Sequence, residues 1–146
     1  MWFCLSRLSE TAANIYRVSP VTVPKEDRWK GFGATNSEEL KTCFEARTKL
    51  TSDDIALGKE LWERFRSGDA SGLLKMAEEG SRAFPYLDET ARAAAEIETR
   101  PSRILSDIRS EGTRDFDAIF VEFSQRAGVY GFGDMQVRRL LDRISA

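Results

Sequence analysis

The chain has 146 residues, of which 41% are hydrophobic and 10% aromatic, a balance that supports a compact domain with a buried core and no need of disulfides or metals. Its formal net charge of −2 excludes the strongly basic balance of a typical DNA-binding domain and any general attraction to anionic membranes. We expect a single domain over 1–146 without a membrane span, because no apolar run approaches the roughly 20 residues that a span needs.

The segment 1–27 has the pattern of short β-strands. Its opening stretch MWFCLSRL is aromatic and apolar, and NIYRVSPVTV alternates between two faces with β-branched residues up to Val23. Pro20 and Pro24 allow only an edge strand or an interrupted one, because proline cannot donate a hydrogen bond to a sheet. The segment therefore predicts one or two strands with an exposed edge.

The loop that follows contains the tripeptide GFG at Gly31 to Gly33, next to Lys30. Backbone amides at a helix start can bind an anion, but the stretch lacks the residue order of a nucleotide-binding or dinucleotide-binding glycine loop. The other interpretation is a loop anchored by Trp29 and Phe32, in which Gly31 and Gly33 provide unusual backbone angles. We favour this second interpretation over the anion site.

From residue 36 to residue 99 the hydrophobic period becomes helical. Each expected helix opens with a residue suited to the N-cap position, and Gly68 and Gly80 are placed to end the second and third helices. The expected helices are 37–50 capped by Asn36 or Ser37, 52–67 capped by Thr51 or Ser52, 70–79 capped by Asp69 or Ser71, and one that opens near Pro85.

Residues 100–146 predict a trio of helices in the order of a helix-turn-helix. The first begins at Pro101 and stops at Gly112, the second carries an aromatic stripe, and the third follows a glycine turn. In that turn Gly133 provides the bend and Asp134 caps the last helix. One face of the last helix is apolar and consists of Val137, Leu140, Leu141 and Ile144.

The polar side of the last helix carries candidate contacts for nucleic acid or for a partner protein. Gln136 and Arg139 are placed to reach bases and Arg143 to reach a phosphate, while Arg138 is expected to pair with Asp142. Acidic side chains on the same helix would repel phosphate. We therefore favour a structural role or a protein contact for Gln136, Arg138, Arg139 and Arg143, with nucleic-acid binding as the alternative.

The chain contains no histidine and only two cysteines, Cys4 and Cys43. Without histidine, Ser-His-Asp and Cys-His catalysis and every histidine-containing zinc site are excluded. The carboxylate pairs at 53–54, 78–79 and 88–89 point about 100° apart on a helix, so they do not converge on one substrate atom. We predict no catalytic, metal-binding or cofactor-binding residue, and two buried free thiols in a reducing cytoplasm in preference to a disulfide.

Four stretches together resemble the C-terminal helical region of a bacterial domain-of-unknown-function family: WKGFGATNSEELKTCFEARTKLTSDDIALGKELWERFRSGD, FPYLDETARAAAEI, RPSRILSDIR and FGDMQVRRLLDRI. The resemblance spans residues 28–144. Full-length members precede this region with a Rossmann-like α/β domain, so the resemblance implies that 1–27 are its last strands and that the chain is a shortened member. It implies no activity. The matching positions are Trp62, Asp69, Phe84, Pro85, Leu87, Pro101, Gly133 and Asp134.

We therefore predict a mainly α fold with short N-terminal strands and about six helices, the last three arranged like a helix-turn-helix. The expected function is a non-catalytic protein-interaction or regulatory module in a bacterial cytoplasm. It would bind a protein partner or a second copy through an exposed apolar surface that involves Trp2, Phe3, Trp29 and the edge of the N-terminal strand. A nucleic-acid-binding protein that uses the last helix is the alternative, and an enzyme that uses carboxylates alone is a third.

Overall fold

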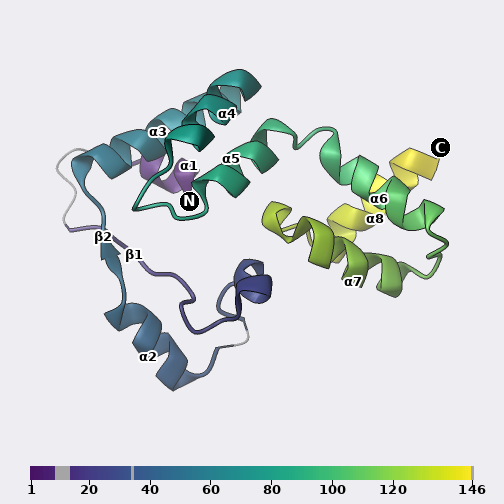
Figure 1. The fold of residues 1–146 in the computed structure, drawn as a ribbon, viewed down its shortest axis with the longest axis horizontal. Helices are drawn as coiled ribbons and strands as arrows, with labels where there is room; N and C mark the ends of the chain where they lie inside the picture. The colour runs from purple at the N-terminus through teal and green to yellow at the C-terminus, as the bar shows by residue number, and fades with distance from the viewer. Residues whose placement is uncertain (9–13, 34, 146) are drawn as a thin grey trace. The chain divides into compact units, whose positions relative to one another are not determined.

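The computed structural model describes residues 1–8, 14–33 and 35–145. The chain forms two compact units, Met1–Ala95 and Glu96–Ala146 (Figure 1), each with its own buried hydrophobic cluster. The described residues are mainly helical with one small antiparallel sheet near the N-terminus, so the predicted fold class is confirmed. Residues 9–13 of the predicted strand segment lie outside the described residues.

The first residues of the chain form a helix, and the prediction of a strand there was wrong. α1 spans Trp2–Ser6. Its Leu5 side chain is buried while Phe3 and Cys4 are exposed. Trp2 packs in the same cluster as Leu5, because residues three apart lie on one face of a helix. Contact with α3 (Ser52–Ser67) stabilises this helix, and the aromatic composition alone did not reveal it.

The sheet pairs β1 (Tyr16–Arg17) with β2 (Thr48–Lys49), and Tyr16 lies opposite Lys49. The backbone N–H of Leu50 donates to the carbonyl of Ile15 (2.9 Å) and extends the pairing. The helix expected over 37–50 is therefore shorter, because α2 spans Ser37–Glu45. Thr48 and Lys49 pair with β1 instead of extending the helix. This pairing joins residues far apart in the chain, so the local sequence pattern does not predict it.

Three helices of the first unit begin at side-chain caps that are among the candidates the sequence predicts. Asn36 forms a capping box with Glu39 at the start of α2, and Thr51 forms one with Asp54 at the start of α3. Asp69 accepts a hydrogen bond from a backbone N–H in the first turn of α4. The other elements of this unit are α4 (Ala70–Glu79), α5 (Leu87–Ala95) and the 3-10 helix η1 (Lys25–Lys30).

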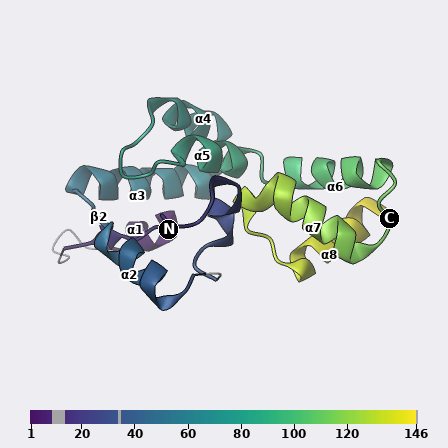
Figure 2. The ribbon, with the colours of Figure 1, turned by 60° about the horizontal axis from the view of Figure 1, so that its bottom comes forward.

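The core of the first unit is built around α3, against which α1, α4 and α5 pack (Figure 2). Leu61 of α3 is fully buried together with Leu73 of α4 and Leu87 of α5, and each buried leucine contributes about 1.5–3 kcal/mol. Gly58, three residues before Leu61, lies against Leu5 of α1, and a Cβ there would overlap the Leu5 side chain. The missing side chain at Gly58 is what lets α1 approach α3.

The second unit is a group of helices in which α6 packs on α7 and α8, and α7 packs on α8. Its fully buried centre includes Leu105, Phe123 and Val137. The apolar face expected for α8 packs against this centre. The elements are α6 (Arg100–Ser110), α7 (Phe116–Ala127), the 3-10 helix η2 (Gly128–Tyr130) and α8 (Asp134–Ser145).

The two GFG tripeptides use their glycines in the same way. Gly31 follows η1 with a φ of 64°, and Gly131 follows η2 with a φ of 62°, values that other residues rarely adopt. Gly33 and Gly133 have no positive φ. The prediction of an unusual angle is therefore confirmed for Gly31 and was wrong for Gly33. In both tripeptides the first glycine ends a 3-10 helix.

Both cysteines are free thiols. Cys43 is fully buried, but Cys4 is exposed, so the prediction of two buried thiols was wrong for Cys4. Cys4 precedes the buried Leu5 on α1, and adjacent helical residues point in different directions. Among the described helices none has the length and apolar character needed to cross a lipid bilayer.

We expect Gly58→Ala to destabilise the first unit. Alanine gains about 0.5–1 kcal/mol in helix propensity, but overpacking against Leu5 costs about 1–3 kcal/mol, so the free energy of unfolding should fall by about 1 kcal/mol. Urea unfolding followed by circular dichroism measures this change. Gly33→Ala is the control, because the nearest atom to its added Cβ is the Lys30 carbonyl oxygen at 3.8 Å. Equal or greater stability of Gly58→Ala would contradict this packing of α1 on α3.

Candidate functional site

Gln136, one of the candidate contacts predicted on the polar face of the last helix, stabilises the start of that helix, α8. The Oε1 atom of Gln136 accepts a hydrogen bond from the backbone N–H of Gly133 (2.9 Å), as the third helical residue does in a capping box. Asp134 is the first residue of α8, and its carboxylate accepts a hydrogen bond from the N–H of Met135 (2.8 Å). Asp134 therefore lies one position later than the expected cap, and Gln136 supports the helix start.

Arg138 contacts an aromatic ring of the neighbouring helix. Its guanidinium carbon lies 3.7 Å from the centroid of the Phe116 ring at the start of α7. Such a cation–π contact contributes about 0.5–1 kcal/mol at an exposed site. The contact takes the place of the ion pair expected with Asp142, which does not form. Arg138 thus joins α8 to α7.

Arg139 and Arg143 are exposed and have no ion pair within the described part of the chain. Arg126 on α7, in contrast, is paired with two glutamates. The connection 128–133 between α7 and α8 is also longer than the turn of about 3–4 residues in a helix-turn-helix. Of the four candidate contacts, the structure leaves Arg139 and Arg143 available to a ligand.

Trp2, Phe3 and Trp29, the candidate partner surface, do not form one cluster. Trp2 is partly buried against the first core. Phe3 is exposed and makes an edge contact with Trp62, with ring centroids 5.2 Å apart. Trp29 instead makes an edge contact with Tyr86, with centroids 5.5 Å apart. Phe3 and Trp29 therefore belong to two separate aromatic contacts of the first unit, and Trp2 packs on its core.

The surroundings of Trp29 explain why it is a structural anchor. The guanidinium of Arg28 lies 5.3 Å from the centroid of the Trp29 ring and 5.8 Å from that of Tyr86. It also donates to the Glu89 carboxylate of α5 (2.6 Å). Trp29 therefore holds η1 against the start of α5, as expected of a loop anchor. Phe32, the other expected anchor, is exposed.

Sequence reasoning missed an exposed surface that α2 shares with β1. Leu40 and Phe44 are one turn apart on α2 and are 43% and 57% exposed, and Tyr16 of β1 is 44% exposed. The guanidinium carbon of Arg47 lies 4.4 Å from the centroid of the Phe44 ring and 5.1 Å from that of Tyr16. We call Tyr16, Leu40, Phe44 and Arg47 the α2 surface. The sequence signal was the apolar stripe of α2, formed by Leu40, Cys43 and Phe44, whose helical spacing does not show whether that side of the helix is buried.

The position of α2 explains why this stripe stays exposed. Cys43 is 0% exposed, and the Thr22 hydroxyl lies 3.9 Å from its Sγ, so the loop after β1 covers that side of the helix. Among the described elements, α1, α4 and α5 make the main contacts with α3. α2 contributes no residue to the core cluster of the first unit. Its apolar side chains are therefore left for contacts outside this core.

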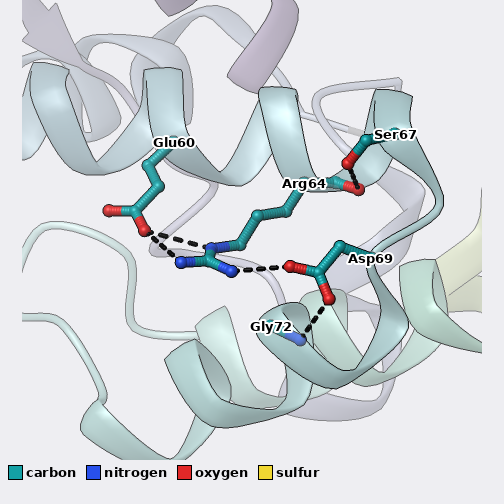
Figure 3. Close-up of polar contacts among 5 residues, drawn as sticks. All are labelled: Glu60, Arg64, Ser67, Asp69 and Gly72. Carbon is teal, nitrogen blue, oxygen red and sulfur yellow. Dashed lines mark hydrogen bonds and ion pairs between the residues drawn. The ribbon is translucent and has the colours of Figure 1, made fainter.

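A polar network joins the end of α3 to the start of α4 (Figure 3). The guanidinium of Arg64 donates to Glu60 and to Asp69, each at 2.6 Å. The second carboxylate oxygen of Asp69 accepts a hydrogen bond from the backbone N–H of Gly72 (2.8 Å). A Cβ at Gly72 would overlap Arg64 and Asp69 side-chain atoms. The network therefore depends on glycine at this position.

The hydrogen bond from Gly72, and then the one from Arg64, lower the pKa of Asp69 below its usual value. A lowered pKa favours the ionised carboxylate, whereas a general acid at neutral pH needs a raised one. The network thus has the properties of a helix junction and not of a proton donor.

Among the residues that the structure describes, no group of three or more metal-binding side chains could hold an ion. Comparisons with protein-family models, with curated proteins and with solved structures found no match for this chain. The resemblance to a domain-of-unknown-function family therefore stays a prediction. Any function proposed for this chain therefore rests on its own sequence and geometry.

We expect Asp69→Asn to lower the free energy of unfolding at pH 7, because asparagine keeps the cap but loses the ion pair with Arg64. The pKa of Asp69 is lower in the folded chain than its usual value of 3.8. The charge therefore stabilises the fold above that value and stops doing so as the pH falls through the folded pKa.

Urea unfolding of the wild-type protein and the variant over a pH series measures the difference between them, which should shrink toward zero in acid. Asp142→Asn is the control, since Asp142 has no ion pair among the described residues. A difference that stays constant with pH would show that the charge of Asp69 is not its cause.

Proposed function

We propose that this protein is a non-catalytic protein-interaction module and that it binds a partner protein through the α2 surface. The observation that carries this proposal is the exposure of Tyr16, Leu40 and Phe44 around Arg47. Single exposed apolar side chains are ordinary on protein surfaces. A contiguous group of them is typical of an interaction site.

The side chains of the α2 surface are of the kinds that protein interfaces favour. Tyrosine, phenylalanine and arginine are enriched in interfaces. Arg47 lies between two rings, and its guanidinium also donates to the Phe44 carbonyl (3.0 Å). An arginine held in this way loses less side-chain entropy on binding. Arg47 is therefore suited to receive a carboxylate of the partner.

Charged residues of both signs adjoin the α2 surface. Lys41 and Glu45 follow Leu40 and Phe44 on α2 and are exposed. A polar rim around an apolar centre is the usual anatomy of an interface. A stable interface buries about 800 Å² on each partner, more than four side chains can provide. The partner should therefore contact this rim as well as the centre.

We expect Phe44→Ala to weaken binding of the partner by roughly 30-fold or more, the effect of losing a central aromatic side chain worth about 2 kcal/mol. A partner is first identified by cross-linking the tagged chain in its source cells, and its affinity for the purified chain is then measured by calorimetry. Val121→Ala is the matched control, because Val121 is 56% exposed and lies on α7. Equal binding by both variants, or the absence of a stoichiometric partner, would overturn the proposal.

The second candidate function is nucleic-acid binding, supported by the exposure of Arg139 and Arg143 without an ion pair in the described part of the chain. Two cations on one helix could contact phosphates and strengthen association at low salt. The second unit as a whole has eight arginines against nine acidic residues, a net charge of −1. This balance gives the candidate less support than the α2 surface has.

If this second candidate is right, duplex DNA should bind at low salt and lose affinity steeply as salt rises. In the double variant Arg139→Gln and Arg143→Gln, the slope of the logarithm of affinity against the logarithm of salt concentration should become smaller by about two, one for each lost phosphate contact. Fluorescence anisotropy with a labelled duplex measures both effects. Arg66→Gln is the control, because Arg66 is exposed on α3 and already paired with Glu63. No binding at low salt would eliminate this function.

A further inference from the structure

The α2 surface is accompanied by three cations that have no ion pair among the described residues: Lys41, Arg47 and Lys49. Lys49 of β2 lies directly opposite Tyr16 of β1, and side chains that oppose each other in an antiparallel pair share one face of the sheet. The guanidinium carbon of Arg47 lies 5.1 Å from the centroid of the Tyr16 ring. Two positive charges therefore accompany this exposed ring.

The acidic residues of α2 are turned away from the exposed apolar side chains or are engaged elsewhere. At 100° per residue, Glu38 and Glu45 point about 120° and 100° away from Phe44. Lys41 points only about 60° away from Phe44 by the same geometry. The Glu39 carboxylate accepts the backbone N–H of the N-cap residue (2.8 Å). Although α2, β2 and the turn between them carry three cations and three acids, the cations are the charges nearest the α2 surface.

Arg47 is held in place and still has donor groups to offer. Its Nη1 donates to the Phe44 carbonyl (3.0 Å), and its guanidinium carbon lies 4.4 Å from the centroid of the Phe44 ring. A guanidinium has five N–H donors, and the others have no acceptor among the described residues. A carboxylate of a partner can therefore bind to an arginine that is already positioned beside exposed rings.

These side chains set two requirements on whatever covers them. Leu40, Phe44 and Tyr16 lose contact with water only when an apolar or aromatic side chain packs on them. The neighbouring cations then lose part of their hydration as well, and a charge removed from water without a counter-ion costs free energy. A neutral or basic partner would leave these cations unpaired, whereas an acidic partner satisfies them.

We propose that the partner of the α2 surface is an acidic protein segment in which carboxylates flank apolar side chains. This inference rests on the proposed function of the α2 surface and adds the chemistry of its partner. An apolar side chain of the segment packs on Leu40 and Phe44. One carboxylate binds the Arg47 guanidinium, and others lie near Lys41 and Lys49.

Selection of a random peptide library on the immobilised full chain tests this chemistry. Bound peptides should be enriched in aspartate or glutamate together with leucine or an aromatic residue, and depleted of lysine and arginine. The affinity of a selected peptide, measured by fluorescence anisotropy, should fall as salt rises, because salt screens exposed charges. Phe44→Ala should weaken binding of the same peptide, which assigns it to the α2 surface.

Substitution of single cations measures their share of the binding. Arg47→Gln should weaken the selected peptide roughly 10-fold, the effect of one lost charged hydrogen bond. Lys49→Gln should weaken it about 2- to 5-fold, because an exposed ion pair contributes less, and Lys49→Arg should retain the affinity. Lys49 is exposed and outside the core cluster, so it is the deciding position if Arg47→Gln does not fold. Arg103→Gln is the control, because it removes one exposed charge from α6 of the second unit.

Selection of neutral or basic peptides that depend on Phe44 would overturn this inference and leave the α2 surface as a binding site. Absence of any enriched peptide would overturn it too, and so would acidic peptides that bind the Phe44, Arg47 and Lys49 variants as tightly as the wild type. The cross-linking experiment then decides the proposed function separately. Single-stranded DNA that stacks its bases on the exposed rings, and binds through Phe44 and Arg47 where acidic peptides fail, would replace the acidic segment with nucleic acid.

Discussion

Burial of the Leu61 face of α3 is the interaction on which the first unit depends. α4 has 10 residues and α5 has 9, which is shorter than the about 12–15 residues at which an isolated helix becomes even marginally stable in water. Their stability must come from packing, and Leu73, Leu87 and Ala91 are all buried in the cluster that contains Leu61. α1 depends on the same helix, because Leu5 fits against Gly58. Most of this unit therefore folds around one side of α3.

The junction between α3 and α4 shows how local chemistry supports that packing. Gly68 ends α3 in a left-handed conformation, and Asp69 immediately caps α4. Arg64 then holds the Asp69 carboxylate, so the end of one helix is tied to the start of the next. The sharp turn presents Leu61 and Leu73 to the same core.

Residues that stay outside the two cores are the ones that carry the functional proposals. α2 buries Cys43 but leaves Leu40 and Phe44 exposed, and Arg47 orders the surface around them. The α2 surface contributes no residue to the core cluster of its unit, and this is the reason to connect it with binding.

By itself the sequence determined where most of the helices begin and end. Asn36, Thr51 and Asp69 were each one of the two residues predicted to cap their helix, and the stop at Gly68 was also predicted. Each of these features depends on hydrogen bonds and backbone angles within about four residues. Only the tertiary structure decided that residues 2–6 are helical, that 48–49 pair with β1 and that the stripe of α2 is exposed. It also decided that Arg138 contacts Phe116. These outcomes depend on contacts between residues far apart in the chain. Local periodicity shows that a helix has an apolar face, but it does not show whether another element covers that face.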